Sequence, residues 1–270
     1  MNKLGTVPFL PLALFVITAS CWGQVQNATV GTLLAQLRST DQSQREEAFN
    51  RLLSDAAVIH TARVQQALLD LLDRENKTLE AENRKSSGSE AAGEGQEDDN
   101  EGEAEYLSKL GETVDSFADW NDPRQVCIFV HEGYNADSKF GAKIAAHART
   151  AVPCLLEMAN SDLGAYRAEA IAVLVQALAK GKGDLEARYV QAAKRQIIKG
   201  LHDQYAVVRG ETVIAIGDFG DADMIPALQD VARSDPGSET RTDNNTQWFP
   251  IREEATKAIA EIQKRVGQHK

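Results

Sequence analysis

Apolar residues recur at intervals of three and four along most of the chain after residue 30, which is the spacing of one face of an α-helix. In three stretches an arginine is followed by a small residue three positions later and by an aliphatic residue seven positions later. These stretches begin at Arg167, Arg209 and Arg252, which are 42 and 43 residues apart. A regular interval of this length predicts an all-α fold built from repeated units.

The same pattern extends weakly toward the N-terminus. Arg124 lies 43 residues before Arg167 and has Cys127 in the small position, but His131 occupies the aliphatic position. Arg45 opens a better match, with Ala48 in the small position. We therefore expect helical units on both sides of an irregular helical segment at 106–140.

A second motif lies between the arginine-led stretches. Residues 152–162 align with residues 225–235 and match at a proline, a leucine, an alanine, a serine and an aspartate. Both stretches have helical apolar spacing. Each unit therefore consists of two helices, one led by arginine and one carrying the proline.

These motifs resemble the HEAT family, and within it the bacterial HEAT-like repeats first named for phycobilin lyases. The likeness is carried by residues 203–209, 215–218, 225–228 and 250–255, and it extends over 150–266 and 30–73. The resemblance implies an α-solenoid, a right-handed superhelix of about five helical hairpins. It places N-terminal HEAT-like helices at 24–79 and HEAT-like repeats at 141–270.

The resemblance also implies a structural role for the charged repeat residues. In such arrays the turn aspartates and helix-start arginines of successive units form a ladder. The residues concerned are Asp203 with Arg209, Asp162 with Arg167, and Asp41 with Arg45. We expect them to hold the units together and not to form a catalytic site.

The first 23 residues resemble a secretory signal peptide. Lys3 is their only charge, and residues 9–19 are mostly apolar but too few to span a bilayer. Cleavage after Gly23 would release a soluble protein into the periplasm or the exterior. The alternative is a lipid anchor at Cys21, because residues 18–21 partly match a lipoprotein signal.

The chain carries 29 basic and 40 acidic residues, a net charge of -11. The excess of acidic residues argues against a nucleic-acid partner, because a protein that binds nucleic acid needs a basic face. Ten of the acidic residues lie in residues 80–105, which contain no large apolar residue before Tyr106. Because such a tract cannot bury apolar surface, we expect an acidic disordered linker there. It lacks the spacing of an EF-hand.

No catalytic, cofactor or metal site is predicted. The histidines lie far apart in the sequence, at His60, His131, His147, His202 and His269. His131 and Glu132 are not followed by the second histidine of a zinc protease, and residues 181–184 lack the spacing of a phosphate loop. The sequence has no Gly-x-Ser-x-Gly elbow and no Cys-x-x-Cys pair.

Two regions are candidates for partner contacts. Trp248 and Phe249 end a long loop before the last helix, and they either anchor a partner or fill the last seam between units. Trp120 and Tyr134 lie in the segment that breaks the repeat, where insertions in solenoids often face the binding surface. A packing irregularity is the alternative there.

After signal removal, Cys127 and Cys154 would be the remaining cysteines. An even pair in an exported chain is compatible with a disulfide, but a buried free thiol suits the small position of Cys127 equally well. Both alternatives stay open at this point.

The sequence favours a non-enzymatic module that binds another protein, with no stable membrane span and no cofactor. The alternatives are an accessory subunit of an enzyme, such as a chromophore lyase, and a lipid-anchored assembly factor of the envelope.

Overall fold

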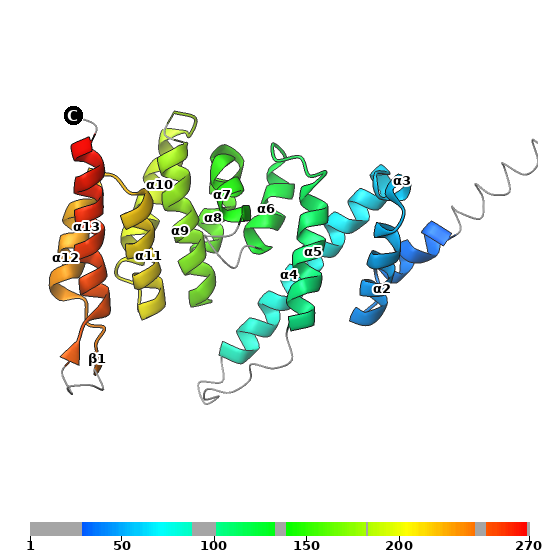
Figure 1. The fold of residues 1–270 in the computed structure, drawn as a ribbon, viewed down its shortest axis with the longest axis horizontal. Helices are drawn as coiled ribbons and strands as arrows, with labels where there is room; N and C mark the ends of the chain where they lie inside the picture. Colours follow the sequence, from blue (N-terminus) through cyan, green and yellow to red (C-terminus); the bar gives the residue numbers. More distant parts are fainter. Residues whose placement is uncertain (1–28, 88–100, 133–138, 182, 241–246, 269–270) are drawn as a thin grey trace, which may run out of the picture.

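The computed structural model describes residues 29–87, 101–132, 139–181, 183–240 and 247–268, and these residues are almost entirely helical. The helices follow one another in chain order along the long axis of the molecule (Figure 1). The expected all-α class is therefore confirmed. The signal peptide at 1–23, Cys21, Tyr134 and His269 lie outside the described residues.

The N-terminal third begins with a helix at 29–36. It continues with α2 (Gln42–Leu53), α3 (Ala56–Ile59), α4 (Ala62–Ser87) and α5 (Glu101–Asp115). Asp41 starts α2 by accepting a hydrogen bond from the backbone N–H of Ser43, which is the usual role of an N-cap aspartate. α4 packs on α5, and Phe49 contacts the ring of Tyr106 edge to face.

The expected disordered linker at 80–105 is too long at both ends. α4 continues to Ser87 and α5 begins at Glu101, while residues 88–100 lie outside the described part of the chain. Arg84 explains why α4 extends so far without apolar burial. Its guanidinium pairs with Glu80 one turn earlier at 2.7 Å and with Asp162 at 3.0 Å. Pairs of this kind support an exposed helix.

The middle of the chain forms α6 (Pro123–Glu132), α7 (Lys139–Ala146) and α8 (Ala148–Met158). The segment at 106–140, expected to be helical but irregular, is helical on both sides of residues 133–138, which are not described. Cys127 on α6 and Cys154 on α8 form a disulfide, with Cα atoms 5.6 Å apart. The two helices pack against each other, which brings the cysteines within the range that a disulfide requires.

We expect reduction of the Cys127–Cys154 disulfide to lower the free energy of unfolding by about 3–4 kcal/mol, because the bond closes a loop of 27 residues in the unfolded chain. Denaturant unfolding with and without reductant measures this difference. The double variant Cys127→Ala, Cys154→Ala is the control and should not respond to reductant. Equal midpoints for the oxidised and reduced wild type would contradict the prediction.

The C-terminal half contains α9 (Gly164–Lys180), α10 (Ala187–Gly200), α11 (Ala206–Phe219), the 3-10 helix η2 (Ala222–Met224), α12 (Ile225–Ser234) and α13 (Pro250–Gln268). α9, α11 and α13 pack side by side, and α8, α10 and α12 lie against them (Figure 1). The repeated small positions, Ala170, Thr212 and Ala255, are fully buried. The arginine-led helices therefore use equivalent positions for the core.

Two short strands were not expected from the sequence. β1 (Glu239–Thr240) and β2 (Gln247–Trp248) form an antiparallel pair in which Glu239 lies opposite Trp248. The pair closes the long connection between α12 and α13. It is too small to change the fold class.

Buried arginines connect successive helix pairs. Arg167 donates from Nε and Nη2 to the carboxylate of Asp203, both at 2.9 Å, and from Nη1 to the carbonyls of Ser161 and Asp162. Arg209 repeats this arrangement 42 residues later. It pairs with Asp235 at 2.6 Å and donates to the carbonyl of Asp203 at 2.9 Å.

The ladder therefore forms, but its side-chain partners differ from those expected. Arg167 and Arg209 each reach the aspartate of the next turn and contact their own turn through main-chain carbonyls. Arg45 pairs with Glu75 on α4, while the side chain of Asp41 remains a helix cap. Burial disfavours ionisation of Asp203, but hydrogen bonds from Arg167 and the Tyr205 backbone outweigh it and lower the pKa of this carboxyl. These contacts join neighbouring turns of the fold.

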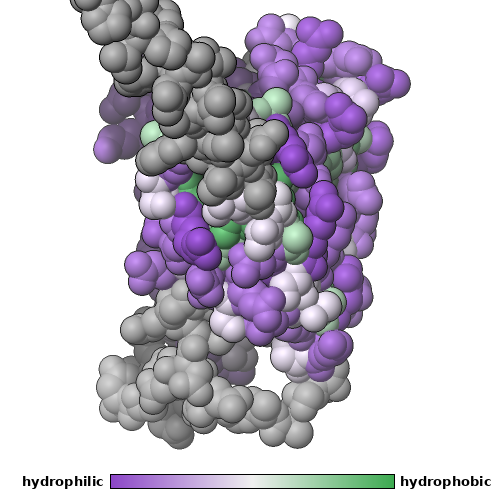
Figure 2. Space-filling view, turned by 90° about the vertical axis from the view of Figure 1, so that its right-hand side faces the viewer, coloured by the Kyte–Doolittle hydropathy of each residue, from purple (hydrophilic) through white to green (hydrophobic). Residues whose placement is uncertain are grey.

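The end of the molecule at α2 and α3 has a mainly hydrophilic surface, with a few hydrophobic residues in the middle of that face (Figure 2). The exposed large hydrophobic residues of the described chain lie elsewhere, between Ile198 and Val266. Among the helices that the structure describes, none combines the length and apolar character needed to cross a bilayer.

Candidate functional site

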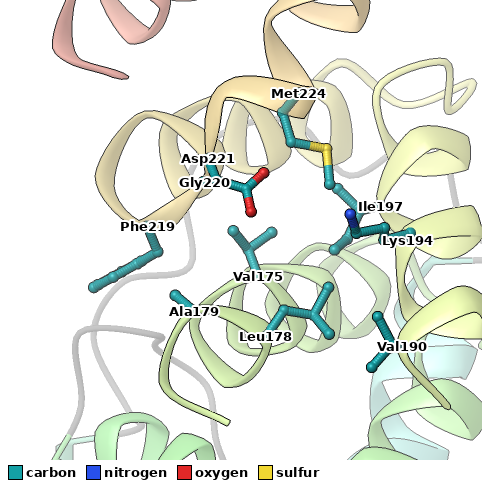
Figure 3. A pocket seen from close by; sticks show the side chains of 10 residues that line it. All are labelled: Val175, Leu178, Ala179, Val190, Lys194, Ile197, Phe219, Gly220, Asp221 and Met224. Carbon is teal, nitrogen blue, oxygen red and sulfur yellow. The ribbon is translucent and has the colours of Figure 1, made fainter. Parts of the chain in front are cut away.

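A cavity of 290 Å³ lies between α9, α10, the end of α11 and η2. Figure 3 shows its lining residues. Its walls are mainly apolar and come from all four elements: Val175, Leu178, Val190, Ile197, Phe219 and Met224. The cavity is partly open to the surface, and this opening, its mouth, can be reached from solvent.

The end of α11 shapes the cavity. A Cβ atom at Gly220 would lie 2.5 Å from the carbonyl oxygen of Ile216, so only glycine permits the chain to leave the helix so closely. Arg265 on α13 donates a hydrogen bond to the Gly220 carbonyl at 2.9 Å. Met224 at the end of η2 then extends over the cavity toward Ile197 (Figure 3).

Three charged side chains lie at or beside the mouth. Lys194 on α10 pairs with Asp223 of η2, with Nζ and Oδ2 2.5 Å apart. A hydrogen bond from the Asp221 side chain, together with Lys194, lowers the pKa of Asp223 to about 2. The hydrogen bond between Lys194 and Asp223 raises the pKa of Lys194, although burial acts to lower it. Figure 3 shows the Asp221 carboxylate directed toward Val175.

The depressed pKa of Asp223 predicts an acid-sensitive contact. Its folded-state value of about 2 lies below the ordinary 3.8, so its ionised form stabilises the fold above pH 4 and this contribution is lost as the pH falls through about 2. Carbon-13 NMR titration of the Asp223 carboxyl should give a midpoint near 2. Asp221→Ala, which removes the side-chain donor, should raise that midpoint; an unchanged midpoint would contradict the assigned cause.

The histidines that the structure describes are not assembled into a metal site. His131 lies 3.9 Å from a Glu80 carboxylate oxygen, and the ring of His147 lies 5.3 Å from that of Trp120. His60 ends α3. Over the described ranges, no three His, Cys, Asp or Glu side chains are grouped as metal ligands would be.

Trp120 is a core residue and is not available as a partner contact. Its side chain is 7% exposed and stacks on Phe129 at 4.7 Å between ring centroids. The indole N–H donates to Asp115 at 3.0 Å, and Lys143 lies over the ring while pairing with the same carboxylate. The turn before α6 therefore packs against that helix through its tryptophan.

Trp248 and Phe249 are both half-buried. The guanidinium of Arg252 lies 3.9 Å from the centre of the Phe249 ring, and its Nε donates to the Asp235 carbonyl at 2.7 Å. Phe249 is thus tied to the last step of the arginine ladder. This contact agrees with a role in the seam between units, although both rings keep some exposed surface.

Sequence reasoning missed an exposed apolar face on α11. Val207 and Ile214 are 54% and 42% exposed and lie two turns apart on the same side of the helix. Gly210 lies between them, with open space where a side chain would be. Exposed Glu211 lies beside Ile214 on this face. The apolar periodicity was visible, but it could not show that this side of α11 is uncovered.

No protein-family model matches the sequence, and no curated protein matches it. Among solved structures, the chain is similar to the crystal structure of an engineered protein. The two share 18% sequence identity, with a TM-score of 0.36 over 87% of this chain and 96% of that one. At this TM-score the similarity does not bear on the function.

Proposed function

We propose that the chain is a HEAT-type α-solenoid that binds another protein through its surface and carries out no chemistry of its own. Support for the repeat comes from the equivalent contacts of Arg167 and Arg209, which join successive helix pairs in the same way. In stacked repeats such contacts lie between neighbouring units, and the array presents an extended surface.

The observation that carries the binding role is the distribution of exposed apolar residues. Of the six large hydrophobic side chains exposed in the described part of the chain, four lie on or next to α11: Tyr205, Val207, Ile214 and Phe219. Scattered single residues need no explanation, but Val207 and Ile214 share one side of α11, and neighbouring exposed apolar residues favour a contact surface. The charged repeat residues, in contrast, are already engaged with one another.

We further propose that the protein is exported and works in the periplasm or the exterior. The Cys127–Cys154 disulfide supports this compartment, because disulfides persist where the surroundings are oxidising. The leader at 1–23 points to the same route. A lipid anchor at Cys21 is the alternative, and the mass of the mature N-terminus distinguishes the two.

Site-specific photo-crosslinking in the native host tests the binding surface. A photoreactive amino acid in place of exposed Val207 on α11 should give a discrete crosslinked product. The same amino acid in place of Gln263, an exposed polar residue of α13, is the matched control and should not. No product at position 207, or equal products at both positions, would contradict binding through α11.

A further inference from the structure

The cavity beside η2 is small and mainly apolar. Sites for drug-sized ligands and cofactors occupy about 300–1,000 Å³, and this one, at 290 Å³, lies at the lower end of that range. Val175, Leu178 and Ile197 line it and offer apolar contact (Figure 3). One large aliphatic or aromatic side chain fits inside it.

The charges at the mouth indicate what should accompany that side chain. Lys194 is already paired with Asp223, and the Asp221 carboxyl lines the cavity beside them, so this place holds two carboxyl groups and one ammonium group. The whole chain also carries a net charge of -11. A cation entering the mouth would be attracted by the carboxyl groups there and by the net negative charge of the chain. An anion would have to compete with Asp223 for Lys194 and would lie beside Asp221.

We propose that this cavity receives one bulky apolar side chain from a segment of a protein partner, and that Asp221 and Asp223 bind a basic side chain next to it. The inference rests on the proposed binding function and specifies the chemistry of the partner. Phe219, 37% exposed at the rim, provides a further apolar contact for the entering segment. The cavity thus recognises a short apolar-basic sequence.

Methionine-methyl NMR of the full-length protein tests this inference without the natural partner. The chain has three methionines, Met1, Met158 and Met224. Met224 lines the cavity, and Met158 is buried in α8. With carbon-13 in the methionine methyl groups and the signal assigned by Met224→Leu, the probe is the capped dipeptide acetyl-Phe-Arg-amide. It should shift the Met224 signal saturably and leave Met158 unchanged.

Two further probes examine the charge preference. Acetyl-Phe-Glu-amide should bind about tenfold or more weakly than acetyl-Phe-Arg-amide, a difference of about 1.4 kcal/mol. Hexanoate represents an anionic lipid chain and should not compete. Tighter binding of hexanoate than of the basic dipeptide would overturn the proposal in favour of a carboxylate ligand held by Lys194.

Two variants separate a specific site from non-specific contact. Ala179→Phe places a ring at the exposed edge of the cavity and should abolish the Met224 shift while the melting temperature stays the same. Asp221→Asn should remove most of the preference for the basic dipeptide and keep the apolar contact. An unchanged titration in Ala179→Phe would overturn the assignment of the cavity.

The two proposals can fail separately. If photo-crosslinking at position 207 succeeds and the dipeptide does not shift Met224, the cavity is not the recognition pocket but the binding function stands. If the dipeptide binds and crosslinking fails, the cavity is a peptide site and the contact surface is not the α11 face.

Discussion

Arg209→Met is expected to lower the free energy of unfolding by about 3–5 kcal/mol, because it leaves the carboxylate of Asp235 buried without its cation. The side chains of Arg209 and Asp235 are only 8% and 2% exposed and lie 2.6 Å apart. The variant also loses the hydrogen bond to the Asp203 carbonyl. Urea unfolding followed by circular dichroism measures the change.

Arg233→Met is the matched control. Arg233 lies on α12, its side chain is 73% exposed, and its pair with Asp230 spans 3.5 Å. Exposed pairs of this kind contribute about 0–1 kcal/mol. Similar losses in the two variants would show that the buried ladder does not connect the units as described.

Ile216→Asp is expected to lower the free energy of unfolding by about 4 kcal/mol or more, since it buries an unpaired carboxylate where Ile216 is fully inaccessible. Ala170→Arg should have an effect of similar size, because Ala170 occupies the small position of α9 and is also fully buried. Thermal unfolding of both variants tests whether Ile216 and Ala170 face the core.

Glu186→Ala is the control for both core variants. Glu186 precedes α10 with its side chain 63% exposed, and it makes no side-chain cap to the helix. Its replacement should leave the melting temperature within the range of ordinary surface substitutions. Equal melting temperatures for the two core variants and this control would show that the inward positions are misassigned.

The helical fold and the core positions could be predicted because they depend on local spacing. The three-residue and seven-residue offsets from Arg167, Arg209 and Arg252 place the small and aliphatic side chains on one face of each helix. The structure buries Ala170 and Ile216 completely, in agreement with that pattern. The cysteine pair could be proposed as a disulfide but not decided, because spacing does not give the separation of two helices.

The partners of the buried arginines could not be predicted from spacing. Arg209 lies six residues after Asp203, yet its carboxylate partner is Asp235 in the next turn, because the guanidinium points along the stack. The partner of Arg45 is Glu75, a residue with no equivalent in the repeat. Pairings between units depend on how helices stack, which a sequence does not show.

The candidate site was also beyond sequence reasoning. Val175, Ile197 and Met224 are ordinary apolar residues of three different elements, and only the turn at Gly220 leaves a space between them. For Trp120, in contrast, the sequence suggested a contact site that the structure does not support. An aromatic residue in a segment that breaks the repeat suggested a surface contact, but stacking on Phe129 and the hydrogen bond to Asp115 place it in the core.

The affinity of the partner crosslinked at position 207 is the most direct test of a binding role. We expect the double variant Val207→Glu, Ile214→Glu to raise the dissociation constant about tenfold or more with no change in melting temperature, because both side chains are exposed and distant from the core contacts. An unchanged dissociation constant would contradict the proposed function. So would a single His, Asp or Glu substitution that abolishes a catalytic turnover while folding and partner binding remain intact.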